Sequence, residues 1–215
     1  MPDTRNNIHL VCFDLGGVLI RTSASWERVL AMAGVEDAQR VASRISDGPK
    51  DPVVAAYETG RIEADEFFHQ VAEKLEIDVV HVRRAASLWL AGPYDGIDVL
   101  LDRLDAQGIS TACLSNTNPF HWDMMTGETH AALPLERLTY RFASHQIGLM
   151  KPAPAIYEHV RRETGVAPDR IVFYDDLEAN VAGARDAGWN AVRIDPRGEP
   201  VTQILTDLVA RGALD

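Results

Sequence analysis

The sequence predicts an α/β protein: a Rossmann-like, doubly wound parallel sheet with an inserted all-helical cap domain. Two observations favour this fold. Short apolar runs rich in strand formers alternate with helical patterns, an order typical of a parallel sheet with helices on both faces. Between residues 19 and 92 the alternation stops, and helical patterns alone follow one another.

Five apolar runs have the length and composition of buried strands. The first ends abruptly at Asp14, and the fourth ends at the pair Asp175-Asp176. Ligands of such sheets bind beyond the carboxyl ends of the strands, so polar residues at these ends indicate a binding site. In chain order the runs cover residues 9–13, 109–114, 140–143, 171–174 and 191–194.

Helical patterns fill most of the remaining chain. In the predicted core they cover residues 96–106, 154–164, 178–187 and 201–208. In the inserted segment they cover residues 25–33, 37–46, 52–59, 64–75 and 79–91. We therefore expect a core made of residues 1–18 and 93–215, and a helical cap of residues 19–92 that lies over the strand ends.

The composition excludes several classes of partner. A net charge of −11, from 32 acidic and 21 basic residues, repels nucleic acid and anionic membranes. No apolar stretch approaches the roughly 20 residues of a membrane span, and residues 1–10 contain no apolar leader core. Cys12 and Cys113 lie in apolar runs, so we interpret them as buried free thiols and expect a cytoplasmic location.

Carboxylates at the ends of the first and fourth runs are candidates for a catalytic site. Asp14 is closely followed by Gly16-Gly17, and glycine lets the backbone come close to an anion. Asp14 could therefore be a nucleophile, although an ordinary Asp at the start of a turn would give the same pattern. The adjacent carboxylates of Asp175 and Asp176 are costly to bury unless something neutralises them. Mg²⁺ prefers carboxylate oxygens and would neutralise both side chains. An N-cap for the following helix would explain only one of the two aspartates.

Two further polar groups follow other strands. Lys151, in GLMKP, precedes a helix start made rigid by proline and could reach a phosphoryl group as a point charge. Ser115 and Asn116 offer a hydroxyl and a backbone N–H that suit a phosphoryl oxygen. Taken singly, Lys151 is better explained as a solvated surface lysine, and a helix-capping turn would also explain Ser115 and Asn116.

In this order and at these strand ends, the features resemble the motifs of the haloacid dehalogenase-like superfamily. FDLGGVL is similar to its first motif, LSNTN to its second, GLMKP to its third and FYDDLEANV to its fourth. YETGRIEADEFF resembles the helical cap of its phosphatase branch. The resemblance implies Mg²⁺-dependent hydrolysis of a small phosphorylated metabolite, such as a sugar phosphate, by a monomer or homodimer.

The resemblance also implies residue roles. Asp14 would attack phosphorus and form an aspartyl-phosphate, while Lys151 would offset the charge of nucleophile and phosphate. The other implied roles are phosphoryl binding by Ser115, Asn116 and Gly17, metal binding by Asp14, Asp175, Asp176 and the Gly16 carbonyl, and loop orientation by Asn180.

One position departs from the family pattern. Most phosphatases of the superfamily carry a second Asp two residues after the nucleophile, which protonates the leaving group and then activates water. Gly16 occupies that position, and such a group typically contributes about 10²–10⁴-fold to the rate. His121 is a candidate substitute, although packing is the commoner role of such a histidine. Arg21, at the first hinge of the cap, could bind substrate or serve the hinge alone.

Two other functions stay open. A 2-haloacid dehalogenase of the same fold needs no metal, and its fourth motif lacks the paired Asp. A non-catalytic module that binds phosphate ligands would explain Gly16. The sequence favours the phosphatase because Asp14, Lys151 and the Asp175-Asp176 pair are all present.

Overall fold

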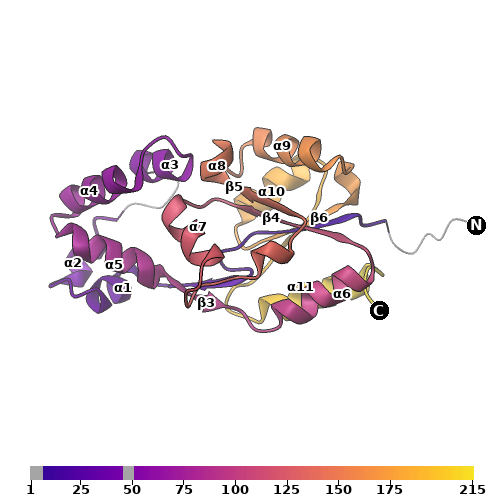
Figure 1. Cartoon of the computed structure of the whole chain (residues 1–215), viewed down its shortest axis with the longest axis horizontal. Helices are drawn as coiled ribbons and strands as arrows, with labels where there is room; N and C mark the ends of the chain where they lie inside the picture. Colours follow the sequence, from indigo (N-terminus) through magenta and orange to yellow (C-terminus); the bar gives the residue numbers. More distant parts are fainter. Residues whose placement is uncertain (1–6, 46–50) are drawn as a thin grey trace, which may run out of the picture.

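A five-stranded parallel sheet forms the centre of the core in the computed structural model, which describes residues 7–45 and 51–215 (Figure 1). Its strand order is β5-β4-β1-β6-β7, and every neighbouring pair is parallel. The strands are β1 (Leu10–Phe13), β4 (Ser110–Ser115), β5 (Tyr140–Ala143), β6 (Ile171–Asp175) and β7 (Asn190–Arg193). All five predicted strands are thus confirmed to within one residue at each end. Residues 1–6 of the predicted core and residue 46 of the predicted helix 37–46 lie outside the described residues.

Helices cover both faces of this sheet, as the doubly wound prediction requires (Figure 1). Along β1, Val11 and Phe13 pack toward α6 (Ile97–Ala106) and α11 (Pro200–Ala210). Leu10 and Cys12 pack toward α9 (Pro154–Thr164) and α10 (Glu178–Asp186). Because successive strand residues face opposite sides, the continuous apolar run of β1 fills two hydrophobic clusters. Cys12 and Cys113 are buried and free, as expected.

The inserted segment contains all five predicted helices, but two short strands enclose them. Strands β2 (Ile20–Thr22) and β3 (Leu90–Pro93) pair antiparallel, with Ile20 opposite Pro93. The prediction of helices alone was therefore incomplete, because strands of three or four residues give no periodic signal and their pairing joins distant parts of the chain. The helices are α1 (Trp26–Met32), α2 (Ala38–Ala42), α3 (Pro52–Glu58), α4 (Ala64–Leu75) and α5 (Val79–Trp89).

Short helices after β4 and β5 were also missed. Helix α7 (Pro119–Thr126) begins at Asn118, whose side chain accepts a hydrogen bond from the His121 N–H at 3.0 Å, a typical N-cap. Helix α8 (Ser144–Ile147) follows β5 directly. Two 3₁₀ turns, η2 (Leu135–Arg137) and η3 (Pro168–Arg170), complete the core.

The inserted helices contact the core beside the strand ends. The Tyr57 hydroxyl accepts a hydrogen bond from the Phe120 N–H at 3.3 Å, and the Phe68 ring meets the Phe120 ring edge-on with centroids 5.2 Å apart. Gly60, with a φ of +67°, lies directly against the His145 carbonyl, where a Cβ would collide. These contacts hold α3 and α4 against α7 and α8.

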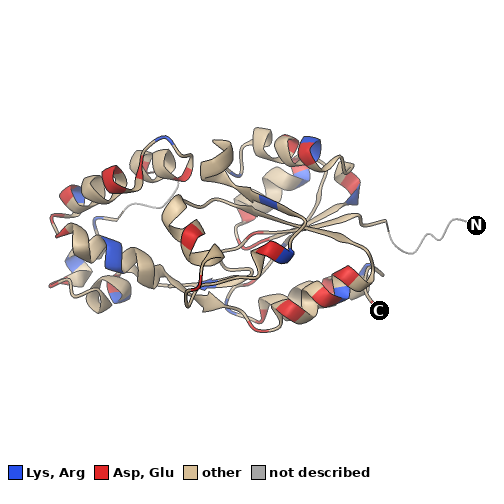
Figure 2. Ribbon diagram, viewed as in Figure 1, with Lys and Arg blue, Asp and Glu red and all other residues tan. Residues whose placement is uncertain are grey.

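The charges are spread over both parts of the molecule. Figure 2 shows acidic and basic residues intermixed along the helices, with more acidic than basic positions. None of the helices in the described part of the chain is long and apolar enough to cross a membrane.

Candidate active site

Asp14 lies directly after β1, the central strand of the sheet. Its backbone N–H donates to the Tyr174 carbonyl of β6 at 2.8 Å, so the ladder between β1 and β6 fixes its main chain. Its Oδ1 accepts a hydrogen bond from the Leu15 N–H at 2.7 Å and lies 3.0 Å from the Lys151 Nζ. Only 8% of Asp14 is exposed, so few water molecules compete for this carboxylate.

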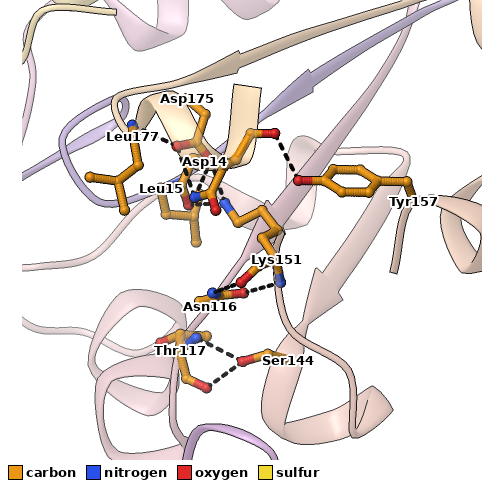
Figure 3. A network of polar contacts seen from close by, with 10 residues as sticks. Asp14, Leu15, Asn116, Thr117, Ser144, Lys151, Tyr157, Asp175 and Leu177 are labelled. Atoms are coloured by element: carbon orange, nitrogen blue, oxygen red, sulfur yellow. Dashed lines mark hydrogen bonds and ion pairs between the residues drawn. The ribbon is translucent and has the colours of Figure 1, made fainter. Parts of the chain in front are cut away.

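Lys151 joins the first and fourth motifs (Figure 3). Its Nζ lies 3.0 Å from Asp14 Oδ1 and 2.7 Å from Asp175 Oδ2, and the side chain is fully enclosed. The two carboxylates raise its pKa despite burial, because they favour the charged ammonium. Lys151 is therefore a buried cation placed beside the predicted nucleophile.

Asp175 is saturated with protein hydrogen bonds. Its Oδ1 accepts from the Leu177 N–H at 2.8 Å and from Asn180 Nδ2 at 3.0 Å, and its Oδ2 accepts from Lys151. Asn180 is in turn anchored by Tyr157, whose hydroxyl donates to the Asn180 carbonyl at 2.8 Å (Figure 3). These hydrogen bonds fix Asp175 against the start of α10 through Leu177 and Asn180.

Three carboxylates converge at this point. Asp14, Asp175 and Asp176 each offer an oxygen, and these oxygens lie within 4.8 Å of one another. Burial raises the pKa of Asp14 despite the opposing attraction of Lys151, and burial with the neighbouring Asp175 raises the pKa of Asp176 to about 6. Lys151 offsets part of this negative charge, and a divalent cation would offset the rest. The donors are all hard oxygen atoms, so the cluster fits Mg²⁺.

The two glycines of the first motif differ in role. Gly17 has a φ of +71°, and a Cβ there would lie 2.6 Å from Asp176 Oδ2, so this position lets Asp176 approach the first motif. Its N–H donates to the Ile20 carbonyl at 2.9 Å. This N–H is therefore occupied within the first motif, and the substrate contact of Gly17 stays a prediction. At Gly16 the nearest atom to a Cβ would be Thr22 Cγ2, at 3.6 Å.

The second motif lies beside a cavity of about 370 Å³ between the core and the inserted helices. Ser115 ends β4 as a buried residue, and both Ser115 and Asn116 contribute to the cavity wall together with Gly16. The Asn116 side chain also binds the main chain of Lys151, a role that the sequence analysis missed. Aromatic residues also line the cavity: Trp26, Tyr57, Phe67, Phe68, Trp89 and Phe120.

Two other predicted candidates have different surroundings. The Arg21 guanidinium binds the Pro93 carbonyl, pairs with Asp95 and lies over the Tyr94 ring, so it supports the β2–β3 hinge, and the cavity wall is formed without it. His121 does line the cavity, but its Nε2 lies 3.0 Å from the Ala86 carbonyl and its Nδ1 lies 3.3 Å from Asn118 Nδ2. Both ring nitrogens are therefore occupied, and burial lowers the His121 pKa.

Glu58, at the end of α3, also lines the cavity and was missed by the sequence analysis. It belongs to the YETGRIEADEFF segment, but the resemblance of that segment to a helical cap gave Glu58 no role of its own. Only the placement of α3 over the strand ends brings it to the site.

The family follows from this site together with a comparison of sequences. A family model described as haloacid dehalogenase-like hydrolase matches residues 8–188, which include all four motifs. The chain belongs to this family. It is therefore a hydrolase of the haloacid dehalogenase-like family, as the motifs predicted.

Several characterised or solved proteins of this family are similar to the chain. A D-ribitol-5-phosphate phosphatase of Bacteroides thetaiotaomicron is 26% identical over 190 residues, 83% of this chain and 88% of that protein. A family enzyme of the same organism, solved in complex with magnesium and inorganic phosphate, has a TM-score of 0.75 at 22% identity, covering 89% of this chain and 96% of that one. An L-2-haloacid dehalogenase of Xanthobacter autotrophicus has a TM-score of 0.63 at 18% identity, covering 94% and 83%.

Proposed function

We propose that this hydrolase of the haloacid dehalogenase-like family cleaves a small phosphomonoester with the help of Mg²⁺, through an aspartyl-phosphate on Asp14. The observation that carries the proposal is the position of Lys151 Nζ between Asp14 and Asp175, with Asp176 in the same carboxylate cluster. The buried ammonium of Lys151 lies beside the nucleophile, and the three carboxylates would hold a metal ion there. Both positive charges would attract an anionic substrate such as a phosphomonoester.

Each residue has a distinct task in this proposal. Asp14 Oδ attacks phosphorus, and the bond from phosphorus to the leaving oxygen breaks. Lys151 holds Asp14 in place and offsets charge on the transferring group, while Ser115 and the Asn116 backbone bind phosphoryl oxygens. Asp14, Asp176 and the Gly16 carbonyl would hold Mg²⁺, with Asp175 in support. The ion would supply electrostatic stabilisation of the phosphoryl charge.

We further propose that helices α1–α5 act as a cap that excludes water and selects the substrate. The cavity that lies between these helices and the strand ends supports this role. The D-ribitol-5-phosphate phosphatase among the relatives supports testing polyol and sugar phosphates first. The aromatic lining supports including aryl and benzyl phosphates in the same panel.

The test is release of inorganic phosphate from this panel, with Mg²⁺ and with EDTA. We expect release to require Mg²⁺ and to fall by more than about 10³-fold in Asp14→Asn, since the nucleophile is lost. Asp186→Asn, an exposed carboxylate at the end of α10, is the matched control and should retain the wild-type rate. Wild-type activity in Asp14→Asn would disprove the nucleophile assignment.

A second candidate is 2-haloacid dehalogenation, in which Asp14 would attack carbon. Similarity to an L-2-haloacid dehalogenase fold and a 31% identity to a Pseudomonas (S)-2-haloacid dehalogenase over 100 residues favour it. The clustered third carboxylate of Asp176 argues against it, because a metal-free reaction leaves that group unneutralised. Halide release from 2-chloropropionate that EDTA leaves unchanged would reverse the ranking.

A further inference from the structure

The proposed reaction lacks a proton donor in the first motif. When the phosphorus bond to the leaving oxygen breaks, an alkoxide needs a proton, and the water that later attacks the aspartyl-phosphate must lose one. Gly16 has no side chain to do either. A substitute must have a titratable group in the same cavity that is not bound to the protein.

Glu58 meets this requirement. It lines the cavity that Gly16, Ser115 and Asn116 also line. Its Oε2 is fully enclosed and has no hydrogen-bond partner among the residues that the structure describes. A buried carboxyl oxygen without a partner is costly, so such a group in a ligand cavity indicates that the missing partner is the ligand.

The surroundings of α3 fix Glu58 against the core. Tyr57, the preceding residue, accepts a hydrogen bond from the Phe120 N–H, and its ring stacks on Phe67 with centroids 4.2 Å apart. Gly60, two residues after Glu58, lies directly against the His145 carbonyl. Contacts on both sides therefore fix the backbone of Glu58 beside the cavity.

The charge state of Glu58 suits proton transfer. Burial raises its pKa to about 7, and the positive charge of Lys151 opposes this shift. A group with a pKa near neutrality can both donate and accept a proton at working pH. Glu58 therefore lies within electrostatic reach of Lys151, whose ammonium is 3.0 Å from Asp14 Oδ1. His121, the candidate from the sequence, has both ring nitrogens occupied.

We propose that Glu58 is the proton-transfer group of the hydrolase, taking the role that Gly16 cannot fill; this inference rests on the proposed phosphatase function. In the first step Asp14 Oδ bonds to phosphorus, the phosphorus bond to the leaving oxygen breaks, and the Glu58 O–H gives its proton to that oxygen, which leaves as an alcohol. In the second step the Glu58 carboxylate takes a proton from water as its oxygen bonds to phosphorus. Asp14 is released as a carboxylate, inorganic phosphate forms, and Glu58 is again protonated.

The two steps predict a specific dependence on the leaving group. A 4-nitrophenolate leaves without protonation, whereas a benzyl alkoxide needs a proton, and both aryl groups suit an aromatic cavity. The value of kcat/KM reports the first step, and accumulation of the aspartyl-phosphate reports the second. A role in packing or substrate binding would affect both substrates alike.

The experiment compares wild-type protein, Glu58→Gln and Glu58→Ala on 4-nitrophenyl phosphate and benzyl phosphate with Mg²⁺. We expect kcat/KM to fall about 10²–10⁴-fold for benzyl phosphate and less than about tenfold for 4-nitrophenyl phosphate. Acid-quenched Glu58→Gln should contain more phosphorylated Asp14 than the wild type. Glu73→Gln, an exposed glutamate on α4, is the matched control and should change neither value.

The outcomes separate the two proposals. Equal losses for both substrates, or no loss for benzyl phosphate, would overturn the role of Glu58 while leaving the phosphatase function intact. Absence of phosphate release by the wild-type protein from every phosphomonoester would overturn the proposed function and this inference with it. A loss confined to benzyl phosphate, with the phosphoenzyme trapped, would support the inference.

Discussion

The Asn116 side chain forms two hydrogen bonds with the main chain of Lys151. Its Nδ2 donates to the Lys151 carbonyl at 2.9 Å, and its Oδ1 accepts from the Lys151 N–H at 2.9 Å (Figure 3). The end of β4 therefore fixes the backbone from which Lys151 extends to Asp14. The second motif both lines the cavity and positions the lysine of the third.

Removing these two hydrogen bonds should lower both the stability and the activity of the protein. In Asn116→Ala the Lys151 N–H and carbonyl lose their partners, which we expect to cost about 1–3 kcal/mol of unfolding free energy. A displacement of Lys151 by about 1 Å should lower kcat by up to about 10²-fold. Urea unfolding and Mg²⁺-dependent phosphate release measure the two effects.

Asn190→Ala is the control for this substitution. The Asn190 Nδ2 also binds main-chain carbonyls, those of Asp169 at 2.7 Å and Ile171 at 3.4 Å, but at the opposite end of the sheet. We expect a stability loss there with an unchanged kcat. If Asn116→Ala lost stability but kept the wild-type kcat, the positioning of Lys151 by Asn116 would be wrong.

Gly17→Ala should weaken Mg²⁺ binding, whereas Gly16→Ala should not. A Cβ at residue 17 would require a left-handed conformation, at about 1–2 kcal/mol, and would lie 2.6 Å from Asp176 Oδ2. We expect the dissociation constant for Mg²⁺, measured by calorimetry, to rise about 10–100-fold. At residue 16 a Cβ has ordinary contacts, so equal weakening in both variants would show that Asp176 is not the group displaced.

Mg²⁺ should stabilise the protein more at high pH than at low pH. Burial raises the pKa of Asp14 and raises that of Asp176 to about 6 in the folded protein without metal. In the unfolded chain both carboxyl groups lose their protons above about pH 4. Between these pH values the folded protein therefore binds more protons than the unfolded chain. Stability of the metal-free protein therefore falls as pH rises through this range. Mg²⁺ needs the carboxylates ionised, so its binding opposes the loss.

Thermal melts with Mg²⁺ or EDTA at pH 5 and pH 8 test this dependence. At pH 8, Mg²⁺ at about 100 times its dissociation constant should add about 2.7 kcal/mol, a rise in Tm of about 5–10 °C. At pH 5 the rise should be clearly smaller. A rise in Tm that is the same at both pH values would mean that Mg²⁺ does not bind at these carboxylates.

The sequence predicted the core better than the site's surroundings. Asp14, Ser115 and Asp175 were found because each directly follows an apolar run, and parallel strands bring such ends together. Strands β2 and β3 were missed because pairing Ile20 with Pro93 joins positions far apart in the chain. The hydrogen bond from the Gly17 N–H to the Ile20 carbonyl likewise leaves no pattern in the sequence.

The position of Glu58 beside the cavity could not be predicted from the sequence. Glu58 is the last residue of α3 and lies in the YETGRIEADEFF segment, which resembled a cap but did not indicate a function for this glutamate. Its function depends on how α3 packs on α7 and α8, which no pattern along the chain specifies. Residues of the four core motifs could therefore be selected from the sequence, whereas the residue that docking of the inserted helices brings to the cavity could not.

The most direct test of the account is to locate the phosphoryl group during turnover. Wild-type protein with Mg²⁺ and 4-nitrophenyl phosphate is quenched in acid within milliseconds, digested and analysed by mass spectrometry. We expect a phosphoryl group on Asp14 in the peptide that contains FDLGGVL, and none when EDTA replaces Mg²⁺. Steady phosphate release with Asp14 unmodified at every time point, or with the phosphoryl group on another residue, would contradict the account.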